Sequence, residues 1–168
     1  IETNELDDSV DLSMITVHQH IPDTAGVNNR VVFGVFNSAT SGASILPGAA
    51  YAVGPGPVLL NGGFSGSAPP DANFKFKAMT YSAAGAGVLT AYRGVGGVLL
   101  TSTVNVGARV TASLLKARIG GSYGAGTYQG EERIASVAKP RRALTASEML
   151  MVYTYMRSRY AKLGVTVE

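Results

Sequence analysis

The chain has 168 residues and a mass of 17.4 kDa, with 21 glycines, no cysteine, no tryptophan and a formal net charge of +3. This length fits one domain, and the 46% content of apolar residues excludes a disordered chain. Without cysteine the chain cannot form a disulfide framework, a zinc finger or a thiol nucleophile. No apolar run reaches the ~18 residues of a membrane-spanning helix, so we predict no membrane insertion.

The ends of the chain differ in charge. Residues 1–25 carry six acidic and no basic side chains, whereas the residues from Gly85 onward carry 11 basic and four acidic ones. Either a nucleic-acid-binding arm or mutual attraction of the two ends would explain this; the scattered basic residues favour attraction, and we predict no nucleic-acid partner. Because the chain starts at Ile1, we expect a processed product or part of a longer protein, with residues 1–9 an acidic segment or linker and 10–168 the domain.

Twenty of the 21 glycines lie between Gly26 and Gly130, which argues against helices there and favours tight turns. Short runs of β-forming residues separate these glycines, at the spacing typical of an antiparallel sandwich or barrel. Phe74-Lys75-Phe76-Lys77 alternates as a half-exposed strand does. The expected strands are 12–21, 31–36, 74–82, 88–93, 98–104, 113–119 and 133–138. The proline-rich stretch 37–73 is expected to form loops, with short edge strands at 50–53 and 58–60.

The end of the chain predicts one helix, at about 146–163. Thr145 and Glu148 have capping-box spacing, and Leu144 and Met149 can form a hydrophobic staple across the cap. Apolar residues then recur at helical spacing, and Gly164 follows as a stop signal. We therefore expect a mainly β fold, an antiparallel sandwich followed by one C-terminal helix.

The junction between the last strands and the helix resembles the C-terminal half of laminin-G-like, concanavalin A-like jelly-roll domains. The matching residues are Ile119-Gly120-Gly121, Gly130, Ile134 and Val137, and Arg142-Ala143-Leu144-Thr145 with Glu148. Upstream, Ala78-Met79-Thr80-Tyr81 with the following hairpin and the strand at 12–17 are similar to further segments of that family, so the resemblance spans about residues 10–163. The family's tryptophan before the segment at 78–81 is missing, and Phe74 or Phe76 is expected to fill its place.

The resemblance implies a concanavalin A-like jelly roll, and divergent forms look like modules on bacteriophage tail and fibre proteins. It therefore implies a non-catalytic recognition module on a virion surface or outside the cell, which binds a host surface glycan or protein through its loops and contacts other virion subunits. A purely structural virion module is the alternative, and a polysaccharide-active enzyme ranks third. A homo-oligomer is one alternative, and the oligomeric state is left open.

The candidate ligand-binding residues are aromatic and polar side chains in or beside the glycine-rich loops: Tyr92, Arg93, Tyr123, Tyr128, Asn28 and Asn29. Tyrosine rings could stack on sugars, and loops are where such folds carry binding residues. For each tyrosine, ordinary packing is the competing interpretation. We predict no catalytic residues, because no expected core strand carries paired carboxylates and Glu131-Glu132 are adjacent.

Two further groups of residues, a histidine pair and a basic cluster, are candidates for a site. His18 and His20 share one face of a strand and could bind a metal or a sugar hydroxyl, or form an ordinary pair on the outer surface of the sheet. Because a third ligand at a definite spacing is missing, we predict no metal site and no cofactor, with calcium left open. The basic cluster at 139–142 could bind an anionic polysaccharide or a phosphate, or it could form a solvated loop.

Overall fold

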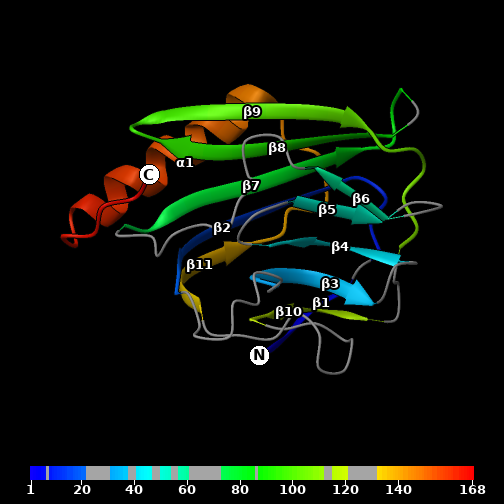
Figure 1. Ribbon diagram of the computed structural model, residues 1–168, viewed down its shortest axis with the longest axis horizontal. Coiled ribbons are helices and arrows are strands. Elements are labelled where there is room, and N and C mark those ends of the chain that lie inside the picture. The colour runs from blue at the N-terminus through cyan, green and yellow to red at the C-terminus, as the bar shows by residue number, and fades with distance from the viewer. Residues whose placement is uncertain are drawn as a thin grey trace.

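The computed structural model describes residues 1–6, 8–21, 31–37, 41–46, 50–53, 57–60, 73–85, 87–111, 115–120 and 132–168. These residues form two antiparallel sheets and one C-terminal helix, which confirms the mainly β, sandwich-like architecture (Figure 1). In spatial order, sheet A contains β1 (Glu2–Leu6), β10 (Lys116–Ile119), β3 (Phe33–Asn37), β4 (Ser41–Ile45), β5 (Ala50–Val53) and β6 (Pro57–Leu60). Sheet B contains β11 (Glu132–Ala138), β2 (Leu12–His20), β7 (Lys75–Ser82), β8 (Val88–Val95) and β9 (Val98–Asn105).

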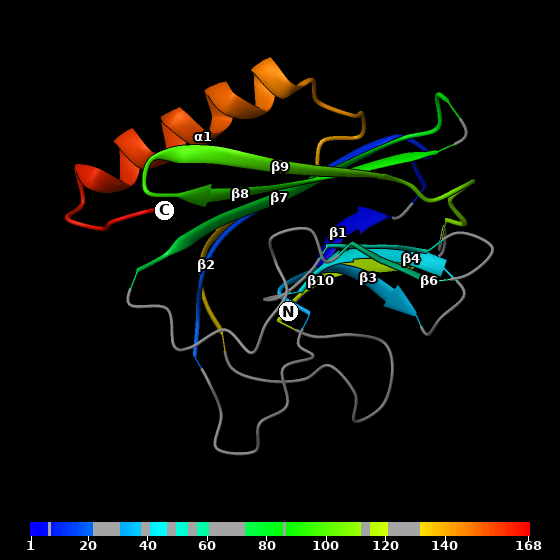
Figure 2. The same ribbon diagram turned by 45° about the horizontal axis from the view of Figure 1, so that its top comes forward.

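The helix α1 (Ala146–Ala161) lies on the outer side of sheet B, so sheet B is the middle of three layers (Figure 2). The strand β2 shows this directly. Its residues Leu12 and Met14 pack with β3 and β4 between the sheets, whereas Ile15 and Val17 pack with the helix. Both faces of β2 are therefore buried, because its side chains alternate between two separate cores.

The helix begins as predicted. The Thr145 side chain accepts a hydrogen bond from the Glu148 backbone, and the Glu148 carboxylate accepts one from the Thr145 backbone, which completes the capping box. Leu144 and Met149 both pack in the helix-side core. In the same core Phe76 is fully buried, and its ring centroid lies 5.1 Å from that of Tyr153. A phenylalanine thus occupies a core position just before the segment at 78–81.

Two strands were not predicted. Glu2–Leu6 forms β1 and pairs with β10, and Ser41–Ile45 forms β4 within the stretch that was interpreted as loops and short edge strands. The sequence of β4 is rich in small residues and carries Gly42, which weakens its strand propensity. Gly42 has a φ of +105°, and an added Cβ would collide with the carbonyl of Val35, so close strand contact requires glycine there.

The acidic N-terminal residues contact basic residues from the second half of the chain. Glu2 pairs with Arg118 at 3.3 Å and with Lys116 at 3.9 Å, both on β10. Asp8 pairs with Arg141 at 2.5 Å. The charge difference between the two ends is thus explained by attraction within the fold. The pairs are exposed, so each stabilises the fold by at most ~1 kcal/mol.

Candidate functional site

The inner face of sheet B is apolar over one half and polar over the other. In the apolar half, Met14, Met79 and Ala91 lie in the core between the sheets. One step further along the same strands the register aligns Thr16 of β2 with Lys77 of β7 and Arg93 of β8. Directly opposite residues share a face, so these polar side chains point inward like their apolar neighbours.

The polar half continues along β2 and β7. His18 lies opposite Lys75, and His20 follows on the same face. We call this set the polar end of sheet B: Thr16, His18, His20, Lys75, Lys77 and Arg93. Figure 2 shows that the strands of sheet A lie against the opposite half of sheet B. The polar end therefore lies outside the apolar core shared by the two sheets.

Hydrogen bonds fix the protonation pattern of His18. The Thr16 hydroxyl donates to the backbone carbonyl of Lys77 at 3.1 Å and lies 3.0 Å from Nδ1 of His18. A hydroxyl has a single proton, so the Nδ1–H of His18 donates to Thr16 Oγ1. A neutral ring then carries its lone pair on Nε2. That atom is buried and has no hydrogen-bond partner among the described residues.

Electrostatics keep His18 neutral. Its side chain is fully buried, and this burial, with the positive charge of Lys77 and the neighbouring His20, lowers its pKa well below the usual 6.5. Nε2 of His18 is therefore a hydrogen-bond acceptor at neutral pH. A hydroxyl or amide donor would satisfy it, whereas an acceptor would be repelled.

The rim of the polar end is more accessible. Arg93 and Lys75 are half-buried, whereas His18, His20 and Lys77 are at most 5% exposed. Lys75 forms an ion pair of 2.5 Å with Glu168, which also accepts a 2.9 Å hydrogen bond from Asn73. The Lys75 ammonium and the Asn73 amide hydrogen bond hold the pKa of the Glu168 carboxyl below its usual range. The last residue of the chain thus belongs to the rim.

The predicted site residues divide between several places. Arg93 lies in the polar end, whereas Tyr92 points to the opposite face, is 3% exposed and packs in the helix-side core. This burial favours the packing role for Tyr92. Asn28, Asn29, Tyr123 and Tyr128 lie outside the described residues.

The segments that hold these four residues are attached at the polar end. Residues 22–30 follow Ile21, and residues 121–131 precede Glu132, which pairs with His20 across β2 and β11. The described residues Ile21 and Glu132, which flank these segments in the sequence, therefore lie at the His20 end of β2.

The interpretation of the histidine pair as an outer-surface pair was wrong. Both rings are buried on the inner face of sheet B, the same face of β2 that carries Met14. Lys77 also departs from the half-exposed strand expected for β7, since it is only 5% exposed. Sequence analysis did not single out Thr16 or Lys77. The available signal was the shared alternation of polar residues, at 16, 18 and 20 and at 75 and 77.

Basic side chains of the cluster at 139–142 form hydrogen bonds and ion pairs with other residues of the same chain. Lys139 donates to the carbonyl of Leu6 at 2.7 Å, Arg141 pairs with Asp8, and Arg142 donates to both carboxylate oxygens of Glu148. The Arg142 hydrogen bond, with those from Thr145, lowers the pKa of Glu148 to about 2. These contacts tie the chain before α1 to the N-terminal segment and to the helix cap.

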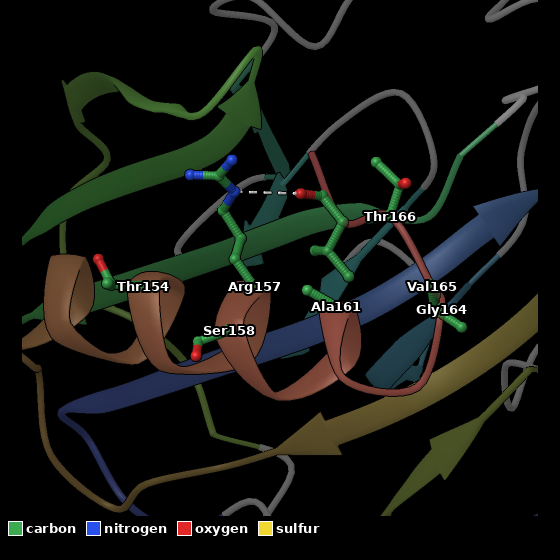
Figure 3. Close-up of a pocket in the computed structure, with 8 residues that line it drawn as sticks. Thr154, Arg157, Ser158, Ala161, Gly164, Val165 and Thr166 are labelled. Atoms are coloured by element: carbon green, nitrogen blue, oxygen red, sulfur yellow. Dashed lines mark hydrogen bonds between the residues drawn. The ribbon is translucent and has the colours of Figure 1, made fainter.

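A hollow of about 530 Å³ lies between the end of α1 and the C-terminal segment (Figure 3). Arg157 crosses it, donating from Nε to the carbonyl of Val167 at 3.3 Å and covering the Tyr153 ring at 5.5 Å. The other lining side chains are small, among them Ser158 and Ala161. Because Arg157 is engaged in holding the C-terminal segment, we regard this hollow as part of the packing of that segment.

Within the described ranges, no three His, Asp or Glu side chains come together as a metal site would require. The described part of the chain also contains no helix with the length and apolar character needed to cross a membrane. Comparisons with models of protein families, with curated proteins and with solved structures find nothing that matches this chain.

Proposed function

We propose that this chain is a non-catalytic recognition module of a virion surface, in a tail or fibre, which binds a host surface glycan at the polar end of sheet B. The proposal includes a concanavalin A-like jelly roll. The sheet orders support it, because β2 lies between β7 and β11 while β10 lies between β1 and β3, so strands from both ends of the chain interleave in each sheet. Such long connections between two antiparallel sheets are typical of jelly rolls.

The observation that carries the ligand class is the buried Nε2 of His18. This lone pair lacks a partner among the described residues, and an unmet buried acceptor costs about 1–3 kcal/mol. A sugar hydroxyl donates the hydrogen bond that it needs. The guanidinium of Arg93 at the rim has several N–H donors, which complement the ring and hydroxyl oxygens of a saccharide.

The test is thermal unfolding of the full chain with a panel of neutral and uronate-containing oligosaccharides at millimolar concentration. Specific binding raises the melting temperature by mass action. We expect at least one saccharide to raise it, with a smaller shift in Arg93→Gln. Arg159→Gln is the matched control, because Arg159 is exposed on α1 away from the polar end.

The competing function is a structural virion module without a ligand. It predicts no shift with any saccharide, and equal behaviour of Arg93→Gln and Arg159→Gln. Equal shifts in both variants would likewise contradict a ligand site at Arg93.

A further inference from the structure

The described sheets end in four edge strands, β1 and β6 in sheet A and β11 and β9 in sheet B. Unprotected edges invite pairing with other chains, and proteins usually block them with charge, proline, shortness or a covering element. Three of these edges show such a device. β1 carries Glu2 and Glu5, β6 has four residues and starts with Pro57, and the β11 carbonyl of Ala135 accepts a 3.0 Å hydrogen bond from Tyr160 of α1.

Among the described residues, the edge strand β9 shows none of these devices. Its eight residues, Val98 to Asn105, include no charged residue, proline or glycine, and six of them are Val, Leu or Thr. Val98 is 60% exposed and Leu100 is 45% exposed. A long, uncharged edge with exposed apolar side chains is a template for a further strand.

The hairpin fixes which backbone groups of β9 are free to pair. Val95 and Val98 face each other across a two-residue turn in which Gly96 and Gly97 have φ of +56° and +89°. The pair that closes such a turn exchanges its backbone hydrogen bonds, and bonded pairs then alternate along the ladder. Even-numbered residues of β9 therefore bond to β8, as the 2.9 Å bond from Val106 N to the Gly87 carbonyl also indicates. The N–H and C=O groups of Leu99, Thr101 and Thr103 point outward.

We propose that β9 pairs with β9 of a second copy of this chain, antiparallel, with a two-fold axis at Thr101. This register sets Thr101 opposite its own copy and Leu99 opposite Thr103 of the second copy, so every outward-pointing residue in the centre finds its hydrogen-bond partner. Residues related by this axis share a face of the sheet, so sheet B continues across the dimer.

We expect the strand that pairs with β9 to come from a second copy of this chain, because β9 is complementary to itself in charge and side-chain type. With no charge on β9, symmetric pairing brings no like charges opposite one another, and facing threonines form a favourable cross-strand pair. On the inner face, Val98 lies opposite Val104 of the second copy. The most exposed apolar residue of β9 is thereby covered by another valine.

The test is sedimentation equilibrium of the full chain over a range of concentrations. We expect a monomer–dimer equilibrium whose dissociation constant rises at least about tenfold in Thr101→Lys, since two lysines would then face each other across the axis. Ala135→Lys is the matched control, because it places the same charge on the opposite edge of sheet B and should leave the equilibrium unchanged.

A second measurement does not depend on a variant. In hydrogen exchange of the wild-type chain, the amides of Leu99, Thr101 and Thr103 should become more protected at high concentration, while those of α1 do not. A monomer at every concentration overturns the proposal, as does a dimer that persists in Thr101→Lys or one that leaves these three amides unprotected.

Discussion

The hydroxyl of Thr16 lies 3.0 Å from Nδ1 of His18, two residues along the same buried strand, and donates its own proton to the carbonyl of Lys77. These two hydrogen bonds leave Nε2 as the acceptor nitrogen of His18, and this nitrogen belongs to the polar end of sheet B. Protonation of the ring is costly, because the added proton would lie in a buried site beside Lys77 and His20.

His18 should make the fold sensitive to acid. Its pKa is depressed in the folded state, so below the usual value of about 6.5 the unfolded chain binds the proton and the folded chain does not. The free energy of unfolding is therefore highest above that pH and falls as the pH drops below it, by about 1.4 kcal/mol between roughly pH 8 and pH 5.5. Urea titrations at several pH values measure this loss.

The control is His18→Gln, in which this part of the pH dependence should vanish even if the variant is less stable overall. An unchanged slope of stability against pH would show that His18 is not the responsible group. Lys75 and Lys77 are the basic residues of β7 next to His18 in the sheet register.

Tyr81 should stabilise the fold through its hydroxyl. It donates to the carbonyl of Gly107 at 2.8 Å and accepts from the backbone N–H of Arg109 at 2.8 Å, and the residue is fully buried. Tyr81→Phe removes both of these buried hydrogen bonds and should lower the free energy of unfolding by about 1–3 kcal/mol in chemical denaturation. Tyr155→Phe, on a 57% exposed ring, should change it by less than about 0.5 kcal/mol. Equal losses in both variants would contradict this role.

Gly87 should tolerate no side chain. Its φ is +83°, and a Cβ there would collide with the carbonyl of Gly107 next to the Tyr81 hydroxyl. Gly87→Ala should therefore cost roughly 4 kcal/mol or more, since backbone must move as well as adopt a strained conformation. Gly96→Ala is matched in φ sign, at +56°, but meets nothing within 4 Å, so it should cost only about 1–2 kcal/mol. Thermal unfolding of the two variants gives the comparison, and similar melting temperatures would refute it.

Thr145 should stabilise the start of α1. Thr145→Ala removes the acceptor of the Glu148 N–H and half of the capping box, which costs about 1 kcal/mol. Thr154→Ala, at an exposed position within the same helix, should be neutral or slightly stabilising, because alanine has the higher helix propensity. Denaturation midpoints of the two variants measure the difference, and a loss that is equal or larger in Thr154→Ala would argue against the cap.

The helix and its cap, the hairpins of β7, β8 and β9, and the sandwich-like class could be predicted from the sequence, because their signals come from residues close in the chain. Thr145 and Glu148 are three residues apart, and the Gly96-Gly97 turn joins its own two strands. Such local patterns carry their signal in spacing and residue type.

Which face of each strand is buried, and which element covers it, could not be predicted from the sequence, because both depend on contacts between segments far apart in the chain. The alternation at Lys75 and Lys77 is typical of an exposed face, yet Lys77 is only 5% exposed on the inner face of the middle layer. The strands β1 and β4 were missed because their pairing partners, β10 and β3, supply the stability that their own residues lack. The unprotected edge of β9 is likewise visible only in the sheet order, since a strand's sequence does not say whether a neighbour lies on both sides.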